Sequence, residues 1–157
     1  MNFSFKIVLY KSGYGGYIYT ILLEGESQTE LEKFLQCEEN KSCPDYKGLR
    51  ARLHQMAEKQ GFRKGFFKHK ESKITNTISA LHYESKGLRL YCYYTSQMII
   101  VGSGGIKGEG SYQNYPECAR AVEILEKADK KIIQRIRDKE IKIEADGKLT
   151  GDLDFSE

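Results

Sequence analysis

A single arginine interrupts an apolar stretch in the middle of the chain, and this is where the search for chemistry begins. Residues 87–94 read Gly-Leu-Arg-Leu-Tyr-Cys-Tyr-Tyr, which predicts a buried strand with Arg89 inside it. Burying a charged group is costly unless the group is paired and hydrogen-bonded. Arg89 therefore either pairs with an acid such as Glu84 across the sheet, or faces a groove and binds an anion.

The next apolar stretch ends in glycines and a lysine. Residues 98–103 predict a second strand, and Gly-Gly-Ile-Lys follows at residues 104–107. Tyr112 and Tyr115 come shortly after Lys107. One interpretation of the two tyrosines is that both pack against the next helix.

Basic residues are concentrated upstream of these strands. From Lys47 to Lys73 the chain carries nine Lys or Arg residues against two Glu, whereas residues 144–157 carry five acids and one lysine. The whole chain has a net charge of +3. The basic segment indicates an anionic partner, with a solvated helix face as the alternative. Aromatic residues lie among the bases, and we expect Phe62, Phe66 and Phe67 to anchor the segment to the core rather than to stack on a ligand.

Several kinds of site are excluded or disfavoured by spacing. The glycines of residues 102–108 fit neither a P-loop nor a dinucleotide fingerprint, and the three histidines are too far apart for a metal site, so we expect no cofactor and no metal. The four cysteines include no C-x-x-C pair and are expected to be reduced, structural thiols. No apolar run approaches the roughly 18 residues of a membrane span, and the N-terminus lacks a secretory signal, so we expect a cytoplasmic protein without a membrane partner.

Hydrophobic periodicity predicts the elements that position these residues. Alternation over residues 3–9 and an apolar run over 17–23 predict an N-terminal hairpin. The pattern Ser-Gln-Thr-Glu at 27–30 predicts a capping box that opens a short helix burying Leu31, Phe34 and Leu35. We expect a loop at 38–44, a second helix from Asp45 to Gly61, and a strand at 74–83 that leads into a three-stranded meander.

Pro116 opens the most clearly predicted helix, in which apolar residues recur on one face up to Ile136. Together these elements predict an α+β fold: an antiparallel sheet, made of the N-terminal strands and the C-terminal meander, packs against two N-terminal helices and one long C-terminal helix. We expect one domain over residues 1–143, followed at 144–157 by an acidic hairpin or loosely attached tail. One hypothesis is that this tail folds over the basic groove and competes with an anionic ligand.

The order of these elements, with Gly-Leu-Arg-Leu-Tyr-Cys and Ile-Ile-Val-Gly-Ser-Gly-Gly-Ile-Lys in the meander, resembles the RelE/HigB-like toxins of bacterial toxin-antitoxin pairs. In that family an arginine lies near the start of one strand, and the following strand ends in a small residue and a lysine before a helix. The resemblance covers roughly residues 5–136. It implies a RelE-like fold and a ribosome-dependent, metal-independent endoribonuclease that cuts messenger RNA and halts translation.

The resemblance also implies roles for individual residues and for partners. Arg89 and Lys107 would stabilise the phosphate under attack by the 2′-hydroxyl. Tyr112 or Tyr115 would stack on a base or assist proton transfer, and Lys68 and His69 lie where the family often places basic catalytic residues. The residues expected to bind RNA are Arg50, Arg52, Arg63, Lys64 and Lys70. The implied partners are messenger RNA, the ribosome and an antitoxin of the helix-turn-helix class. The alternative is a non-catalytic RNA- or protein-binding module on the same fold.

Overall fold

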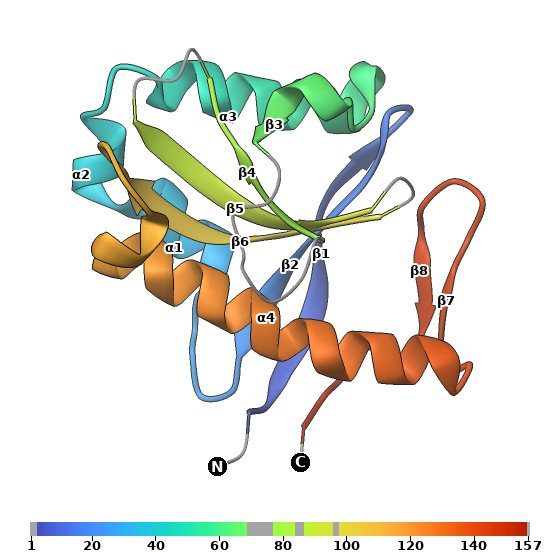
Figure 1. Ribbon diagram of the computed structural model, residues 1–157. Helices are drawn as coiled ribbons and strands as arrows, with labels where there is room; N and C mark the ends of the chain where they lie inside the picture. The colour runs from blue at the N-terminus through green and yellow to red at the C-terminus, as the bar shows by residue number, and fades with distance from the viewer. Residues whose placement is uncertain (1–2, 69–76, 84–86, 96–97, 157) are drawn as a thin grey trace.

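A mixed sheet forms the centre of the computed structural model, which describes residues 3–68, 77–83, 87–95 and 98–156 (Figure 1). Its six strands have the spatial order β1-β2-β6-β5-β4-β3. Neighbouring strands are antiparallel except β2 and β6, which are parallel. The strands are β1 (Phe5–Gly13), β2 (Gly16–Leu23), β3 (Phe67–Lys68), β4 (Ile78–Leu81), β5 (Leu88–Tyr94) and β6 (Ile99–Ile106).

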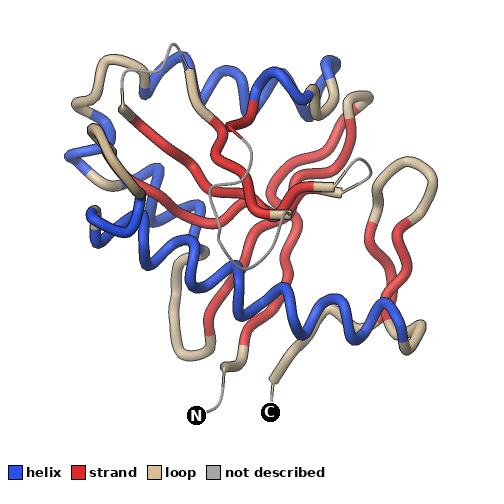
Figure 2. Tube along the Cα trace, viewed as in Figure 1, coloured by secondary structure: helices blue, strands red, loops and turns tan. Residues whose placement is uncertain are grey.

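Helices cover both faces of this sheet (Figure 2). The long helix α4 packs on one face with Tyr91, Tyr93 and Ile100, and the N-terminal helices pack on the other with Leu88, Leu90 and their neighbours. The helices are α1 (Glu30–Gln36), α2 (Glu38–Lys41), α3 (Tyr46–Gln55), which continues as a π-helical turn (Met56–Gln60), and α4 (Pro116–Arg137); short 3-10 turns occupy Lys64–Phe66 and Tyr112–Asn114. The predicted α+β class and the long C-terminal helix are confirmed. The sheet, predicted to be antiparallel, is antiparallel except at the parallel β2–β6 pair.

The edge of β6 is only partly covered by β2. The two strands pair from Ile18 to Thr20 on β2, opposite Ile99 to Val101 on β6. The Thr20 hydroxyl then donates to the Val101 carbonyl at 2.6 Å and accepts from the Leu31 amide at 3.3 Å. Thr20 thus ends the β2–β6 ladder and attaches the first turn of α1, which packs beside the second half of β6.

Two predictions for the α1–α2 region are wrong in detail. The capping box uses Thr29 and Glu32 rather than Ser27 and Glu30: Thr29 Oγ1 accepts from the Glu32 amide at 3.1 Å, and Glu32 Oε1 accepts from the Thr29 amide at 2.9 Å. Threonine takes this position because it has extended backbone angles immediately before the first helical turn. Residues 38–41, predicted as a loop, form the single-turn helix α2.

The acidic C-terminal segment packs against the outer side of β1. Strands β7 (Ile141–Ile143) and β8 (Leu149–Gly151) form a small hairpin, so a domain boundary at 143 would cut through it. Beyond β8, the Phe155 ring stacks on Phe5 with centroids 4.4 Å apart, and Asp154 lies 4.0 Å from Lys6. The described part of the tail therefore lies on β1 and not over the basic helix α3, which contradicts the hypothesis of an internal competitor.

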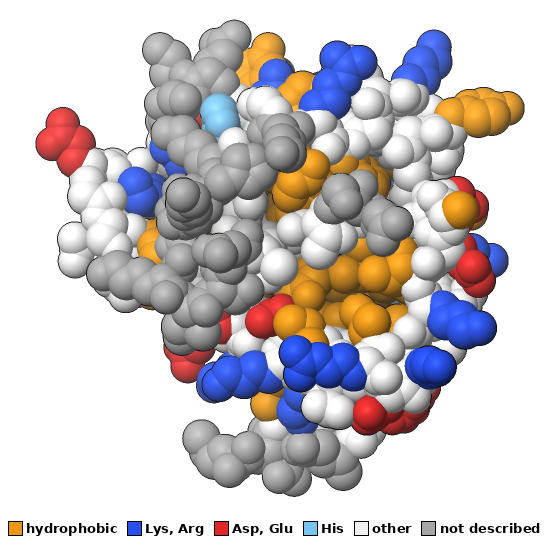
Figure 3. Space-filling model, turned by 45° about the vertical axis from the view of Figure 1, so that its right-hand side comes forward, with side chains coloured by type: hydrophobic (Ala, Val, Ile, Leu, Met, Phe, Trp, Pro, Cys, Tyr) orange, Lys and Arg blue, Asp and Glu red, His pale blue; other side chains and the backbone are white. Residues whose placement is uncertain are grey.

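Basic side chains also gather over α4. Figure 3 shows Lys and Arg side chains along the lower part of the molecule, below an apolar hollow. On α4 the exposed bases include Lys127, Lys130 and Arg137. In the described ranges, no helix is both long and apolar enough to cross a membrane.

Candidate anion-binding site

Arg89 is almost completely buried, and nothing in the described chain neutralises it. Only 5% of its surface is exposed. Its side chain lies on the α4 face of β5, whereas its neighbours Leu88 and Leu90 point to the opposite face. Its Nη1 donates to the Leu88 carbonyl at 3.3 Å, and its Nε has no hydrogen-bond partner. Among the described residues no ion pair reaches it, and Glu84, the acid considered as its partner, lies outside them. The arginine is thus a buried cation with an unsatisfied Nε and, among the described residues, no acidic partner.

The glycines of β6 explain how Arg89 fits beside α4. Gly105 lies directly opposite Arg89, and a Cβ atom there would come within 2.9 Å of Glu117 Cβ on α4. At Gly104 a Cβ would lie 1.9 Å from the Arg89 carbonyl oxygen. A larger residue at either position would push the strand away from its neighbours. The glycine-rich exit is therefore a packing feature that brings β5, β6 and the start of α4 close together.

Lys107 lies at the same end of the β5–β6 pair. Its amide donates to the Gly87 carbonyl at 2.7 Å, two residues before Arg89. Its side chain is half-buried, and Nζ lies 3.4 Å from the Gly108 carbonyl oxygen. The structure therefore brings the backbones of Arg89 and Lys107 together, as an antiparallel pair requires.

The two tyrosines of the following loop serve partly to build it. Tyr112 is 7% exposed, and its ring centre lies 6.3 Å from that of Tyr91 on β5. Tyr115 is half-buried at the N-terminus of α4, and its hydroxyl donates to the Glu109 carbonyl at 2.8 Å. Both rings pack near the end of β6, and the Tyr115 hydroxyl is the more accessible of the two groups.

The other predicted catalytic residues are only partly located. The Lys68 backbone pairs with Ala80 on β4. Its side chain lies outside the described residues, as do His69, Lys70 and the side chain of Lys64. In the residues that can be assessed, no group of three or more His, Cys, Asp or Glu side chains could hold a metal ion.

The predicted RNA-binding arginines lie on the α3 side of the sheet, away from the face that carries Arg89. Arg50 and Arg63 are exposed. The Arg52 guanidinium lies 4.5 Å from the Phe66 ring centre and 5.0 Å from that of Tyr83, and Nη1 donates to the His82 carbonyl at 2.9 Å. Arg52 thus holds the segment after α3 against the sheet, and the sheet separates the three described RNA-binding arginines from Arg89.

Electrostatics near α3 agree with a surplus of positive charge. Burial, followed by the charges of Lys11 and Arg50, lowers the pKa of His54. Phe67 is buried and stacks on Tyr94 at 4.4 Å, and Phe62 and Phe66 pack on the same core, so the expectation of an aromatic anchor is confirmed. An open cavity of about 230 Å³ remains beside Arg52 and Arg63.

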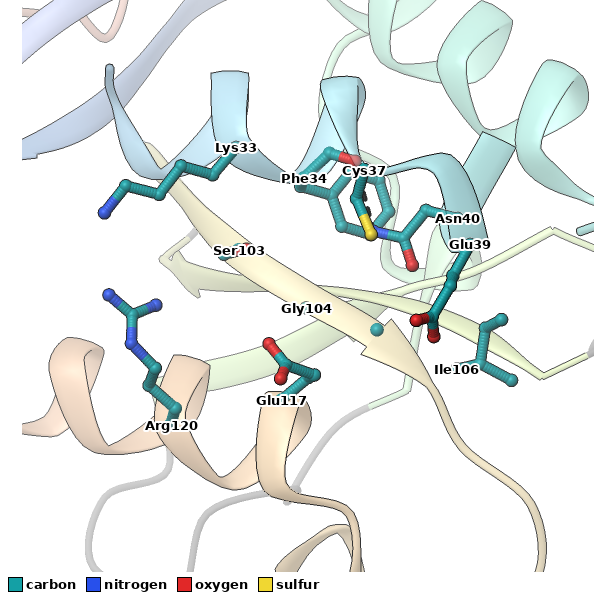
Figure 4. A pocket seen from close by; sticks show the side chains of 11 residues that line it. Lys33, Phe34, Cys37, Glu39, Asn40, Ser103, Gly104, Ile106, Glu117 and Arg120 are labelled. Atoms are coloured by element: carbon teal, nitrogen blue, oxygen red, sulfur yellow. Dashed lines mark hydrogen bonds between the residues drawn. The ribbon is translucent and has the colours of Figure 1, made fainter. Parts of the chain in front are cut away.

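A larger pocket, of about 420 Å³, was not predicted (Figure 4). It lies along the second half of β6, between α1–α2 and the first turns of α4. Next to it, the carboxylate of Glu30 is 1% exposed and binds Arg120 Nη1 at 3.0 Å and Lys33 Nζ at 2.7 Å. The only sequence signal was an acid at the first position of an amphipathic helix, a place where acids are common.

Comparisons with known proteins assign no family to the chain: no protein-family model matches it, and no characterised protein or solved structure matches it significantly. The resemblance to RelE/HigB-like toxins therefore depends on the residues of the β5–β6 pair and on the order of the elements around them.

Proposed function

We propose that the chain is an endoribonuclease of the RelE/HigB-like type, which cleaves messenger RNA and so inhibits translation. The observation that supports it most is the state of Arg89, a buried guanidinium with an unsatisfied Nε and no acidic partner among the described residues. Binding a phosphate stabilises such a buried guanidinium, because the anion supplies both the opposite charge and the hydrogen-bond acceptors.

The proposed reaction is a transfer within the RNA backbone. The 2′-oxygen attacks the adjacent phosphorus, the bond from phosphorus to the 5′-oxygen breaks, and the products carry a cyclic phosphate and a 5′-hydroxyl. Negative charge accumulates on the phosphate oxygens in the transition state, where Arg89 and Lys107 act as electrostatic stabilisers. Tyr115 is the described group best exposed to exchange a proton with the 2′-hydroxyl or the leaving oxygen.

The exposed bases of the two helical faces support binding of a polyanion. Arg50 and Arg63 lie on the α3 side, whereas Lys127, Lys130 and Arg137 lie on α4. Phosphate contacts of this kind give affinity without sequence specificity and weaken with salt. In the proposal these faces contact the ribosome or its RNA, and an antitoxin of the helix-turn-helix class neutralises the protein.

A second candidate is a non-catalytic RNA-binding module. It is favoured by the burial of Tyr112 and by the carbonyl that already accepts the Tyr115 proton, since both leave fewer free groups for proton transfer. In this case the exposed arginines of the α3 side would matter more than Arg89.

Induced expression in bacteria separates the two candidates. Wild-type protein is expected to arrest growth and to leave cleaved messages, whereas Arg89→Ala and Lys107→Ala abolish both effects. Lys142→Ala, at an exposed position on β7 outside both helical faces, is the matched control and keeps them. Arrest without cleavage that disappears in an Arg50→Ala/Arg63→Ala variant would establish the binding module. Cleavage that survives both Arg89→Ala and Lys107→Ala would refute the assignment of the site.

A further inference from the structure

One edge of β6 is open along the second half of the strand. Because β2 pairs with β6 only as far as Val101, no strand of the described chain lies beside this edge from Gly102 to Ile106. The Lys107 amide bonds to the carbonyl of Gly87, the residue before β5, so by alternation the amide and carbonyl groups of Ile106 point away from β5. Apart from the ladder to β5, no hydrogen bond within the described chain reaches Ser103, Gly104 or Ile106.

A groove runs along this edge of β6. The pocket of about 420 Å³ follows the exposed edge, with α1 and α2 as one wall and the start of α4 as the other. Figure 4 shows Cys37 and Glu39 on the first wall and Glu117 and Arg120 on the second, with β6 between them. An extended chain laid here would pair with β6 and have a helix on either side, which is the arrangement of β-strand addition.

The charges on the two walls of the groove indicate which charge a bound segment should carry. The cations Lys33 and Arg120 both pair with the buried carboxylate of Glu30, and Lys33 also pairs with Glu26, so two carboxylates balance the two cations. Glu39 and Glu117, by contrast, are exposed and form no ion pair with any residue that the structure describes. The groove is therefore locally acidic on a chain whose net charge is +3.

We propose that this groove binds an extended basic segment of a partner protein, which adds to β6 as a further strand. Successive side chains of a strand point to opposite sides. One residue of the segment then meets Glu117 on the α4 wall, and its immediate neighbour meets Glu39 on the α2 wall. The complementary sequence is thus a pair of adjacent Lys or Arg residues within a β-prone segment. This surface is independent of RNA cleavage, because it uses neither Arg89 nor Lys107.

The test is a binding titration with a fluorescent peptide of about eight residues, in which Thr and Val alternate around a central Lys-Arg pair. Saturable binding is expected, and replacing the basic pair by Glu-Glu weakens it about tenfold or more, as two partly exposed ion pairs would. N-methylation of alternate amides is expected to abolish binding when the methyl groups lie on one edge of the peptide and to leave it intact when they lie on the other, because only one edge pairs with β6.

Protein variants locate the peptide on the groove. Glu39→Gln/Glu117→Gln is expected to weaken binding about tenfold, whereas Glu123→Gln, an exposed acid elsewhere on α4, leaves it unchanged. No saturable binding, equal binding of both N-methylated peptides, or equal effects of the groove and control variants would overturn the proposal. Self-association of the chain through this edge, detected by its mass in solution without peptide, would also overturn it.

Discussion

Replacing Arg89 by methionine is expected to stabilise the fold while removing the proposed activity. Arg89 is 5% exposed, makes one hydrogen bond, of 3.3 Å, to the described residues and leaves Nε unsatisfied. An unsatisfied buried polar group costs about 1–3 kcal/mol, and methionine fills a similar volume without that cost. We therefore expect the free energy of unfolding of Arg89→Met to rise by about 1–3 kcal/mol, which corresponds to a Tm increase of about 2–10 °C for a chain of this size.

Urea unfolding followed by circular dichroism measures this change, and an unchanged m-value shows that the two midpoints are comparable. Arg137→Met is the matched control, because Arg137 is exposed on α4 and its replacement should leave stability within about 0.5 kcal/mol. A loss of about 3–5 kcal/mol for Arg89→Met would refute the reasoning, since a loss of that size is typical of breaking a buried ion pair. It would mean that Arg89 is a structural residue with its own acid.

Three further predictions concern the rest of the fold. Burial raises the pKa of the Cys92 thiol, so Cys92 should resist alkylation in the native protein, whereas half-exposed Cys37 should react. Mass spectrometry after brief labelling measures both modifications, and faster labelling of Cys92 than of Cys37 would contradict the prediction. Burial and then Asp129 raise the pKa of Tyr93 above its ordinary value of 10.0. The folded state therefore holds the Tyr93 proton more tightly than the unfolded state, so its contribution to stability is complete below pH 10 and is lost as the pH rises further. In Tyr93→Phe the free energy of unfolding should fall less steeply above pH 10, by up to about 1.4 kcal/mol per pH unit. The same slope in Tyr93→Phe and wild-type protein would contradict this prediction. Thr29→Ala removes the cap of α1 and should cost about 1 kcal/mol in thermal or urea unfolding, whereas Ser27→Ala should cost almost nothing.

The regular elements were predictable because their signals are local. Alternation of apolar residues identified the hairpin of β1 and β2, and apolar spacing after Pro116 identified α4. The end of β6 was not predicted, because Gly104 and Gly105 weaken any strand signal and are required only by the close approach of β5 and α4.

The candidate site was predicted less completely than the fold. Arg89 and Lys107 do lie at one end of the β5–β6 pair, as their places in two consecutive strands suggested. The α3 arginines were grouped with them by charge alone, and the structure separates them because α3 packs on the opposite face of the sheet. The open edge of β6 had no sequence signal, since it arises where the Thr20 hydroxyl ends a pairing between segments about 80 residues apart.

The most direct measurement follows the RNA itself. Purified protein is incubated with ribosomes translating a defined message, and the new RNA ends are mapped and tested for a 5′-hydroxyl. We predict cleavage by the wild-type protein with 5′-hydroxyl ends, and a loss of about 10²–10³-fold in rate for Arg89→Met, the size expected when one stabiliser of the transition-state charge is removed. An intact message with the wild-type protein, or an unchanged rate with Arg89→Met, would contradict the proposed role of Arg89.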